Sequence, residues 1–120
     1  MALRRPFSSL RTPVAEHDRQ RLRDFCTALP GVVPIADVAP REFATVAGEI
    51  SSVRIVPKAD SSPWLEATIK DGTGAMVAMW TGRRRMPGIR TGRRLKISGR
   101  GSPTGVAGRL KVLNPDYELL

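Results

Sequence analysis

The sequence contains little of what most catalytic and metal sites require. One cysteine, Cys26, excludes an internal disulfide and any multi-cysteine metal site, and one histidine, His17, leaves no zinc cluster and no partner for a cysteine nucleophile. No apolar run approaches the roughly 18–20 residues that a membrane span requires. The phosphate-binding pattern GxxxxGK[ST] is also missing. We therefore expect a non-catalytic, cytoplasmic protein with no cofactor and no membrane partner.

Acidic residues are absent from one long segment. The 120 residues carry 20 Lys and Arg against 11 Asp and Glu, a net charge of +9. No acid occurs between Gly72 and Pro115, where the basic residues are Arg83, Arg84, Arg85, Arg90, Arg93, Arg94, Lys96, Arg100, Arg109 and Lys111. The alternative is an ordinary solvated surface in an arginine-rich protein, but scattered acids would seldom spare so long a segment. The patch indicates a partner that carries phosphates, such as DNA or RNA.

The first third of the chain is predicted to contain one helix. Residues 1–11 are basic and contain serine, which predicts a flexible arm. A helix is expected over residues 12–30, because Thr12 is a suitable N-cap, Pro13 suits the first helical position and apolar residues follow at helical spacing. This apolar stripe comprises Leu22, Phe25, Cys26 and Leu29, where Cys26 is interpreted as a small buried apolar residue. Residues 31–42 contain two prolines and are predicted to be a linker.

From residue 43 onward the apolar residues alternate with polar ones, which predicts strands. Five strands are expected, at about residues 45–55, 64–70, 75–80, 93–100 and 109–113, with a bulge at Ser51-Ser52. Asp71 is interpreted as a turn residue whose carboxylate caps the hairpin at residues 71–74. Five short antiparallel strands close most economically into a small barrel. The predicted fold is therefore all-β, with an N-terminal α-helix before a five-stranded oligonucleotide-binding (OB) barrel over residues 43–120.

Four segments resemble a known family. They are Val46–Ile50, Ile69–Gly74, Gly92–Gly99 and Asn114–Leu119. In this order they resemble the OB-fold nucleic-acid-binding domain that forms the wedge of bacterial RecG-type branch-migration helicases. The chain is also similar to short stand-alone OB proteins of actinobacteria, which share Gly82-Arg83-Arg84 and Met86-Pro87-Gly88-Ile89. The resemblance covers roughly residues 41–120 and implies a general nucleic-acid-binding role, without the helicase motor.

A basic groove with stacking aromatics is the usual site for a single strand. The predicted site residues are Arg54, Lys58, Trp64, Arg83, Arg84, Arg85, Arg90, Arg94, Lys96 and Arg100. Trp64 shares the outward phase of its strand and is the stacking candidate, its alternative being a cover over the barrel mouth. Trp80 is expected in the core, which leaves Val77 and Met79 on the outer face for apolar contacts with bases or a protein.

The sequence thus predicts a non-catalytic protein that binds single-stranded or structured DNA or RNA through phosphate contacts, with a role in DNA repair or recombination. The alternative is a protein-interaction module that uses the barrel face and the apolar stripe of the helix. DNA and RNA, single strand and fork, and every oligomeric state stay open at this point.

Overall fold

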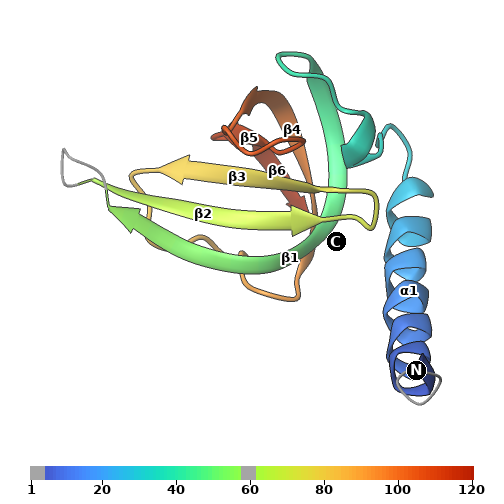
Figure 1. Cartoon of the computed structure of the whole chain (residues 1–120). Helices are drawn as coiled ribbons and strands as arrows, with labels where there is room; N and C mark the ends of the chain where they lie inside the picture. The colour runs from blue at the N-terminus through green and yellow to red at the C-terminus, as the bar shows by residue number, and fades with distance from the viewer. Residues whose placement is uncertain (1–4, 58–61) are drawn as a thin grey trace.

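The computed structural model describes residues 5–57 and 62–120, and for residues 5–13 it describes the backbone alone. Helix α1 (Arg5–Thr27) is followed by a short 3-10 helix, η1 (Ile35–Asp37). The strands in these ranges are β1 (Phe43–Pro57), β2 (Pro63–Lys70), β3 (Ala75–Thr81), β4 (Arg94–Pro103), β5 (Leu110–Leu113) and β6 (Asp116–Leu119). Figure 1 shows the strands gathered into one body, with α1 lying beside it.

Five of the strands form a closed ring. β1 pairs with both β2 and β4, β2 pairs with β3, β3 with β5, and β5 with β4. The pairings are antiparallel, except that β3 and β5 run parallel. A ring of this kind, preceded by a helix, confirms the predicted all-β OB fold.

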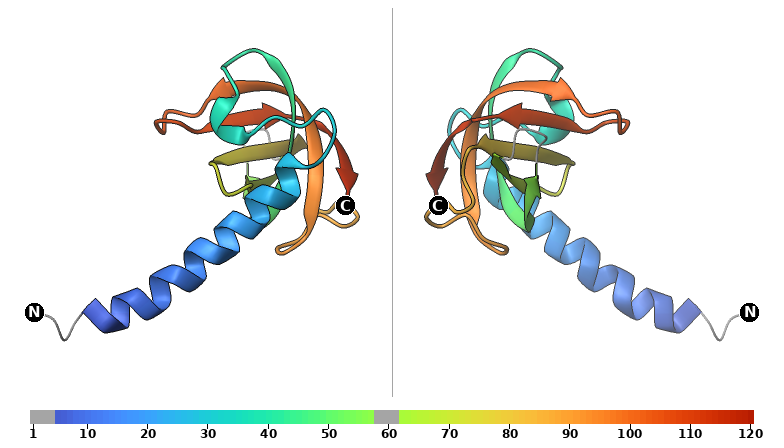
Figure 2. Two further views of the ribbon diagram at one scale, coloured as in Figure 1. Left: turned by 90° about the vertical axis from the view of Figure 1, so that its right-hand side faces the viewer. Right: turned by 90° about the vertical axis from the view of Figure 1, so that its left-hand side faces the viewer.

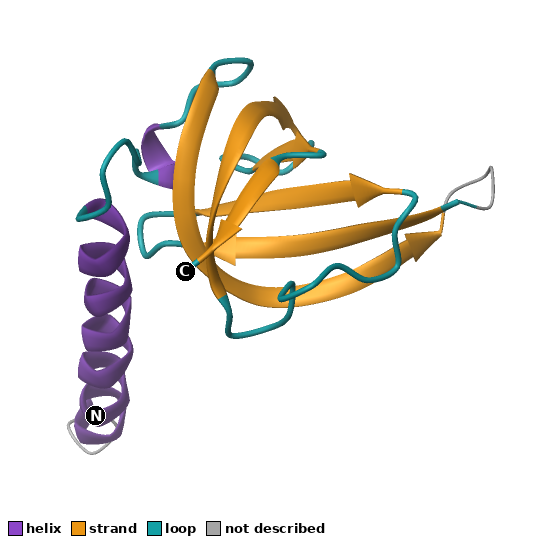
Figure 3. Cartoon of the chain, turned by 180° about the vertical axis from the view of Figure 1, so that it is seen from behind, coloured by secondary structure: helices purple, strands orange, loops and turns teal. Residues whose placement is uncertain are grey.

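The length of β1 makes this closure possible. Its first part pairs with β4 from Phe43 to Glu49, and its second part pairs with β2 from Glu49 to Pro57. The register with β2 shifts between Ile50 and Ser52, which confirms the predicted bulge. A bulge bends a strand and increases its twist. Figure 3 shows the result, since β1 curves around the body from one side to the other.

The interior of the ring is apolar. In β2, Leu65, Ala67 and Ile69 are at most 2% exposed, as the alternation predicted. Trp80 is 4% exposed and belongs to the same core, which confirms its predicted place. Its indole Nε1 donates to the carbonyl oxygen of Pro115 over 3.1 Å, and the Tyr117 ring packs edge-on against it with 5.7 Å between ring centroids.

The last strand, β6, was not expected. Asn114 has a φ of 50° and Pro115 has no N–H to donate, so regular pairing is interrupted between β5 and β6. The chain then pairs with β4 again from Asp116 to Leu119. Strand pairing resumes because Tyr117 and Leu119 face the core on alternate positions.

The prediction of an exposed apolar surface on β3 is wrong. Val77 and Met79 have the outward phase, but they are only 9% and 5% exposed. The register places Val77 between Thr68 and Lys111, and Met79 between Glu66 and Leu113, so side chains of both neighbouring strands flank each residue. Little of either residue is left to contact a base or a partner protein.

The helix also differs from its prediction. It begins at Arg5, so residues 5–11 are helical where a flexible arm was expected, and residues 1–4 lie outside the described residues. Pro6 falls in the first turn, where an N–H has no partner within the helix, and Pro13 removes only one hydrogen bond from a long helix. Figure 2 shows the N-terminal half of α1 running away from the strands. No helix in the described ranges is long and apolar enough to cross a membrane.

Only the C-terminal half of α1 docks on the closed sheet. Cys26 is 1% exposed, which confirms its interpretation as a buried residue. Burial raises the pKa of its thiol to about 11, and the nearby carboxylates of Asp71 and Glu49 act in the same direction. Gly72 lies against the helix with a φ of +89°, and a Cβ at this position would be 2.6 Å from the carbonyl oxygen of Arg19. Glycine is therefore required at position 72, both for the positive φ and for the close contact between the turn and the helix backbone.

Candidate nucleic-acid interface

The outer face of the sheet at β2 and β3 carries Trp64. This residue is half-buried and lies between Val56 of β1 and Thr81 of β3 in the strand register. It faces outward because the next residue, Leu65, is buried in the core. The structure therefore offers one flat aromatic side chain on this face, and stacking on a base stays a prediction for it.

Arg54 lies on the same face but already has a partner. Its Nε donates to Glu66 Oε1 over 2.5 Å, and the two residues are directly opposite in the register of β1 and β2. The carboxylate of Glu66 raises the pKa of Arg54. The side chain of Arg54 is 71% exposed, so a phosphate can reach it from solvent, in competition with Glu66. Lys58, which was predicted beside it, lies outside the described residues.

The arginine run Arg83–Arg85 lies in the connection between β3 and β4 and is exposed. The amide of Gly82 donates to the carbonyl oxygen of Pro63 over 2.8 Å, which holds the start of this connection next to Trp64. Met86 and Ile89 anchor the connection, since both are 8% exposed and belong to the core. Arg90 is exposed between Ile89 and β4.

No acid among the described residues neutralises these arginines. Among the ion pairs formed within residues 5–57 and 62–120, none includes Arg83, Arg84 or Arg85. An unpaired guanidinium keeps all its donors for a ligand, and its planar fork matches two phosphate oxygens. The run therefore presents three adjacent positive charges to solvent.

The three basic residues of β4 lie elsewhere, and each has a partner. Arg94 pairs with Glu49 at 3.3 Å, and Lys96 pairs with Glu118 at 3.5 Å. Arg100 donates to the carbonyl oxygen of Arg41 over 2.9 Å.

The order of the strands shows which way the basic side chains of β4 point. In the ring, β1 separates β4 from β2, and β5 separates it from β3, so the outer face of β4 points away from Trp64. The structure thus places Arg54 and Trp64 on the outer face of β1 and β2, with the run Arg83–Arg85 starting beside the first residues of β2. It places Arg94, Lys96 and Arg100 on the outer face of β4.

Three basic residues that the site prediction omitted lie along the β2–β3–β5 side. Lys111 is exposed on β5 opposite Val77, Lys70 is exposed at the end of β2, and Arg109 directly precedes β5. The alternation of Leu110 and Val112 already indicates that Lys111 points outward. The parallel pairing of β3 with β5 was the missing information, because it alone puts Lys111 beside β3.

No metal site accompanies this surface. Within the part of the chain that the structure describes, no three His, Cys, Asp or Glu residues are grouped so that they could hold a metal ion. Apart from the Glu66 carboxylate that pairs with Arg54, the charged groups beside the Trp64 indole on this face are guanidinium and ammonium groups.

A closed five-stranded sheet with a basic outer face defines an OB-fold module. The family described as "OB-fold nucleic acid binding domain" matches residues 44–120, and the chain belongs to this family. A search of the curated proteins finds no match.

Two solved structures show the same fold. One is RecG bound to a three-way DNA junction, with a TM-score of 0.57 and 20% identity over 72% of this chain. The chain spans 12% of that RecG chain. The other is the replication factor A related protein from Methanobacterium thermoautotrophicum, with a TM-score of 0.56 and 20% identity over 74% of this chain and 90% of that one.

Proposed function

We propose that this protein binds single-stranded or structured DNA or RNA through phosphate contacts and catalyses no reaction. One observation carries the proposal. The run Arg83–Arg85 is exposed, forms no ion pair with a described residue and starts beside β2, the strand that carries Trp64, in a member of a nucleic-acid-binding family. Basic side chains that follow a backbone, with an aromatic ring for a base, are the usual elements of single-strand binding.

In this proposal each side chain makes the type of contact that its chemistry allows. The guanidinium groups of Arg83–Arg85 bind phosphate oxygens, and the Trp64 ring stacks on one base. Arg54 exchanges its hydrogen bond to Glu66 for one to a phosphate. Lys111 adds a positive charge on β5. Contacts of this kind carry little sequence information, so we expect binding that tolerates most sequences.

We further propose that the ligand includes branched DNA and that the protein acts in DNA repair or recombination. The similarity to RecG, whose structure contains a three-way DNA junction, supports branched DNA as a ligand beside single strands. It also supports a role in DNA repair or recombination. A nucleic-acid ligand also supports a place of action in the cytoplasm.

The proposal is tested by fluorescence anisotropy with labelled single-stranded DNA, single-stranded RNA, duplex DNA and forked DNA over a series of salt concentrations. If four to six phosphates are neutralised on a single strand, log K should fall with log salt with a slope of about −3 to −4. A preference for single strands or forks over duplex should accompany it. No binding at low salt, or an affinity that salt does not change, would contradict the proposal.

A protein-interaction module is the second candidate, and the projecting half of α1 favours it. Val14 is 61% exposed there, in a part of the helix that runs away from the strands. A partner bound in this way should remain bound when unlabelled nucleic acid is added, whereas a partner captured through nucleic acid should be released.

A further inference from the structure

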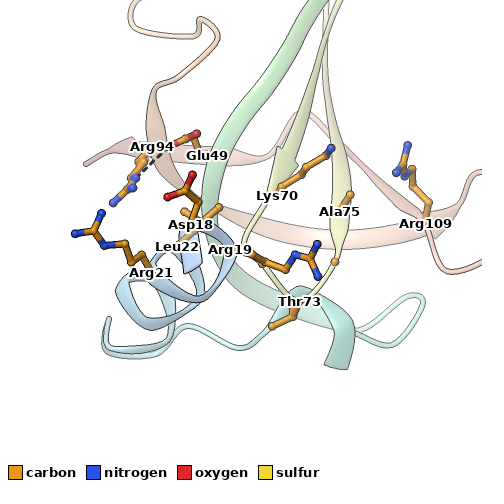
Figure 4. Close-up of a pocket in the computed structure, with 12 residues that line it drawn as sticks. Asp18, Arg19, Arg21, Leu22, Glu49, Lys70, Thr73, Ala75, Arg94 and Arg109 are labelled. Atoms are coloured by element: carbon orange, nitrogen blue, oxygen red, sulfur yellow. Dashed lines mark hydrogen bonds and ion pairs between the residues drawn. The ribbon is translucent and has the colours of Figure 1, made fainter. Parts of the chain in front are cut away.

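An open groove of about 770 Å³ lies between the C-terminal half of α1 and the turn that joins β2 to β3. We call it the α1 groove. Its charged lining consists of the basic residues Arg19, Arg21, Lys70, Arg94 and Arg109 and the acidic residues Asp18 and Glu49. Figure 4 shows that these side chains come from the helix, from the strands of the closed sheet and, for Arg109, from the residue before β5. The nucleic-acid contacts proposed above include no residue of α1.

The charges in the α1 groove are divided between its two sides. Figure 4 shows Arg21, Asp18 and the ion pair of Arg94 with Glu49 on one side, where acids and bases compensate each other. On the other side of the groove are Arg19, Lys70 and Arg109. This second set has an excess of positive charge next to the β2–β3 turn.

The three cations of the second set are available to a ligand. Lys70 and Arg109 form no ion pair with any of the described residues. Arg19 pairs with Glu16 at 2.9 Å, but the two side chains are 55% and 58% exposed. An exposed pair of this kind contributes little free energy, so a phosphate can replace the carboxylate.

The same side of the groove is continuous with the sheet surface proposed to bind nucleic acid. Lys70 is the last residue of β2, whose outer face carries Trp64. Arg109 directly precedes β5, whose outer face carries Lys111. A strand that crosses β2, β3 and β5 and leaves by the β2–β3 turn therefore meets Arg19 of α1 next.

The helix backbone at Arg19 packs closely against this turn. Gly72 contacts the helix backbone at Arg19 so closely that a Cβ would lie 2.6 Å from its carbonyl oxygen. Cys26 is buried further along the same helix. Because the backbone that carries Arg19 is already in place, only its side chain must become ordered when a ligand binds, which favours binding.

We propose that α1 is part of the nucleic-acid interface, and that the phosphate backbone leaving the sheet at Lys70 and Arg109 continues into the α1 groove and contacts Arg19. This inference rests on the proposed function and gives it a longer footprint than the sheet alone provides. Short oligonucleotides occupy the sheet only, whereas longer ones also reach the helix.

Arg19→Gln tests the inference, with Arg23→Gln as its matched control. Both substitutions remove one positive charge from exposed arginines one turn apart on the same helix, but Arg23 is not among the residues that line the groove. Affinities are measured by anisotropy with oligothymidines of about 6 and 16 nucleotides, near the limits of OB-fold site sizes. For the longer oligonucleotide we expect Arg19→Gln to weaken binding by roughly threefold to tenfold and to reduce the salt slope by about 0.7. Arg23→Gln should match the wild type, and the shorter oligonucleotide should not distinguish the three proteins.

Two further variants separate a phosphate contact from a change in the helix. Arg19→Lys keeps the charge and should retain most of the affinity that Arg19→Gln loses. Glu16→Gln removes the carboxylate that competes for Arg19 and should strengthen the binding of the longer oligonucleotide. If the wild type binds but Arg19→Gln and Arg23→Gln behave alike, the helix is not part of the interface and the proposed function stands. If the wild type binds neither oligonucleotide, both proposals are wrong.

Discussion

Asp71 and Ile35 are joined by a buried hydrogen bond in which the Ile35 amide donates to Asp71 Oδ2 over 2.9 Å. The other carboxylate oxygen, Oδ1, accepts from the amides of Thr73 and Gly74 over 2.8 and 3.1 Å, and from the Thr73 hydroxyl over 2.7 Å. Asp71 is 1% exposed. The predicted cap of the hairpin is therefore confirmed, and the same carboxylate also attaches η1 to the β2–β3 turn.

Asp71→Ala is expected to lower the free energy of unfolding by about 3 kcal/mol, because it leaves buried amides without an acceptor. Urea unfolding measures this change. Asp37→Ala is the matched control, since Asp37 is an exposed acid in η1 with the same charge. Equal unfolding midpoints for the two variants would show that Asp71 does not hold these segments together.

Charge reversal should distinguish the two groups of predicted arginines. Arg84 is exposed and has no ion-pair partner among the described residues, whereas Arg100 lies on the outer face of β4 with the Arg41 carbonyl oxygen as its partner. We expect Arg84→Glu to weaken single-strand binding at least about tenfold, because it replaces an attraction to phosphate by a repulsion. Arg100→Glu should have a much smaller effect on affinity. The triple change of Arg83, Arg84 and Arg85 to Glu should abolish binding.

Thermal unfolding provides the control for charge reversal. All three arginines of the run are exposed, so their substitution should leave the melting temperature close to that of the wild type. A larger loss of affinity with Arg100→Glu than with Arg84→Glu would show that the interface lies on the outer face of β4.

Trp64 should report directly on stacking. Its intrinsic fluorescence is expected to be quenched by single-stranded DNA, whereas Trp80 is 4% exposed and should not respond. Trp64→Phe should therefore lose the quenching but keep most of the affinity, because a phenyl ring can still stack. Trp64→Ala should weaken binding by about 1–3 kcal/mol, the usual contribution of one stacked base. Quenching that persists in Trp64→Phe would contradict this assignment.

Stability should depend on the thiol of Cys26 at high pH. The pKa of this thiol is about 11 in the folded protein, above its ordinary value of 9.0, so the folded state binds the proton more tightly than the unfolded chain. The resulting stabilisation is complete below pH 9 and is lost as the pH rises through 11. Two pKa units correspond to about 2–3 kcal/mol.

Urea unfolding of the wild type and Cys26→Ala between pH 8 and 11 measures this contribution. Groups that titrate in both proteins affect both equally, so only their difference in unfolding free energy matters. We expect the advantage of the wild type to shrink across this range. An advantage that stays constant with pH would show that the thiol ionises as readily in the folded protein as in the unfolded chain.

Much of the closed sheet could be predicted because its information is local. The alternation of Leu65, Ala67 and Ile69 identifies a half-buried strand, and the pair Ser51-Ser52 marks the bulge by breaking that alternation. Asp71 was assigned as a cap from its place before Gly72-Thr73-Gly74. Each of these features depends on neighbours a few residues away.

The missing parts depend on contacts between distant segments. Arg94 and Lys96 form ion pairs with Glu49 and Glu118 and are therefore less available to a phosphate. Only the pairing of β4 with β1 and β6 brings these acids near them. Val77 and Met79 were expected to be exposed because the alternation shows only that they point outward, and it does not show which side chains of the neighbouring strands lie beside them.

The start of the helix was predicted too late for a local reason. Pro13 was interpreted as the first helical residue, although a long helix accommodates a proline at this position.

The two pairings of β1 also have a consequence for how the chain folds. Its second part pairs with β2, a neighbour in sequence, and that hairpin can extend to β3 once residue 81 has been synthesised. Its first part must wait for residues 94–100. Until then the nascent chain presents an unpaired strand edge between Phe43 and Glu49, which is open to association with other chains. We expect this closing step, with its large sequence separation, to set the folding rate of the whole domain.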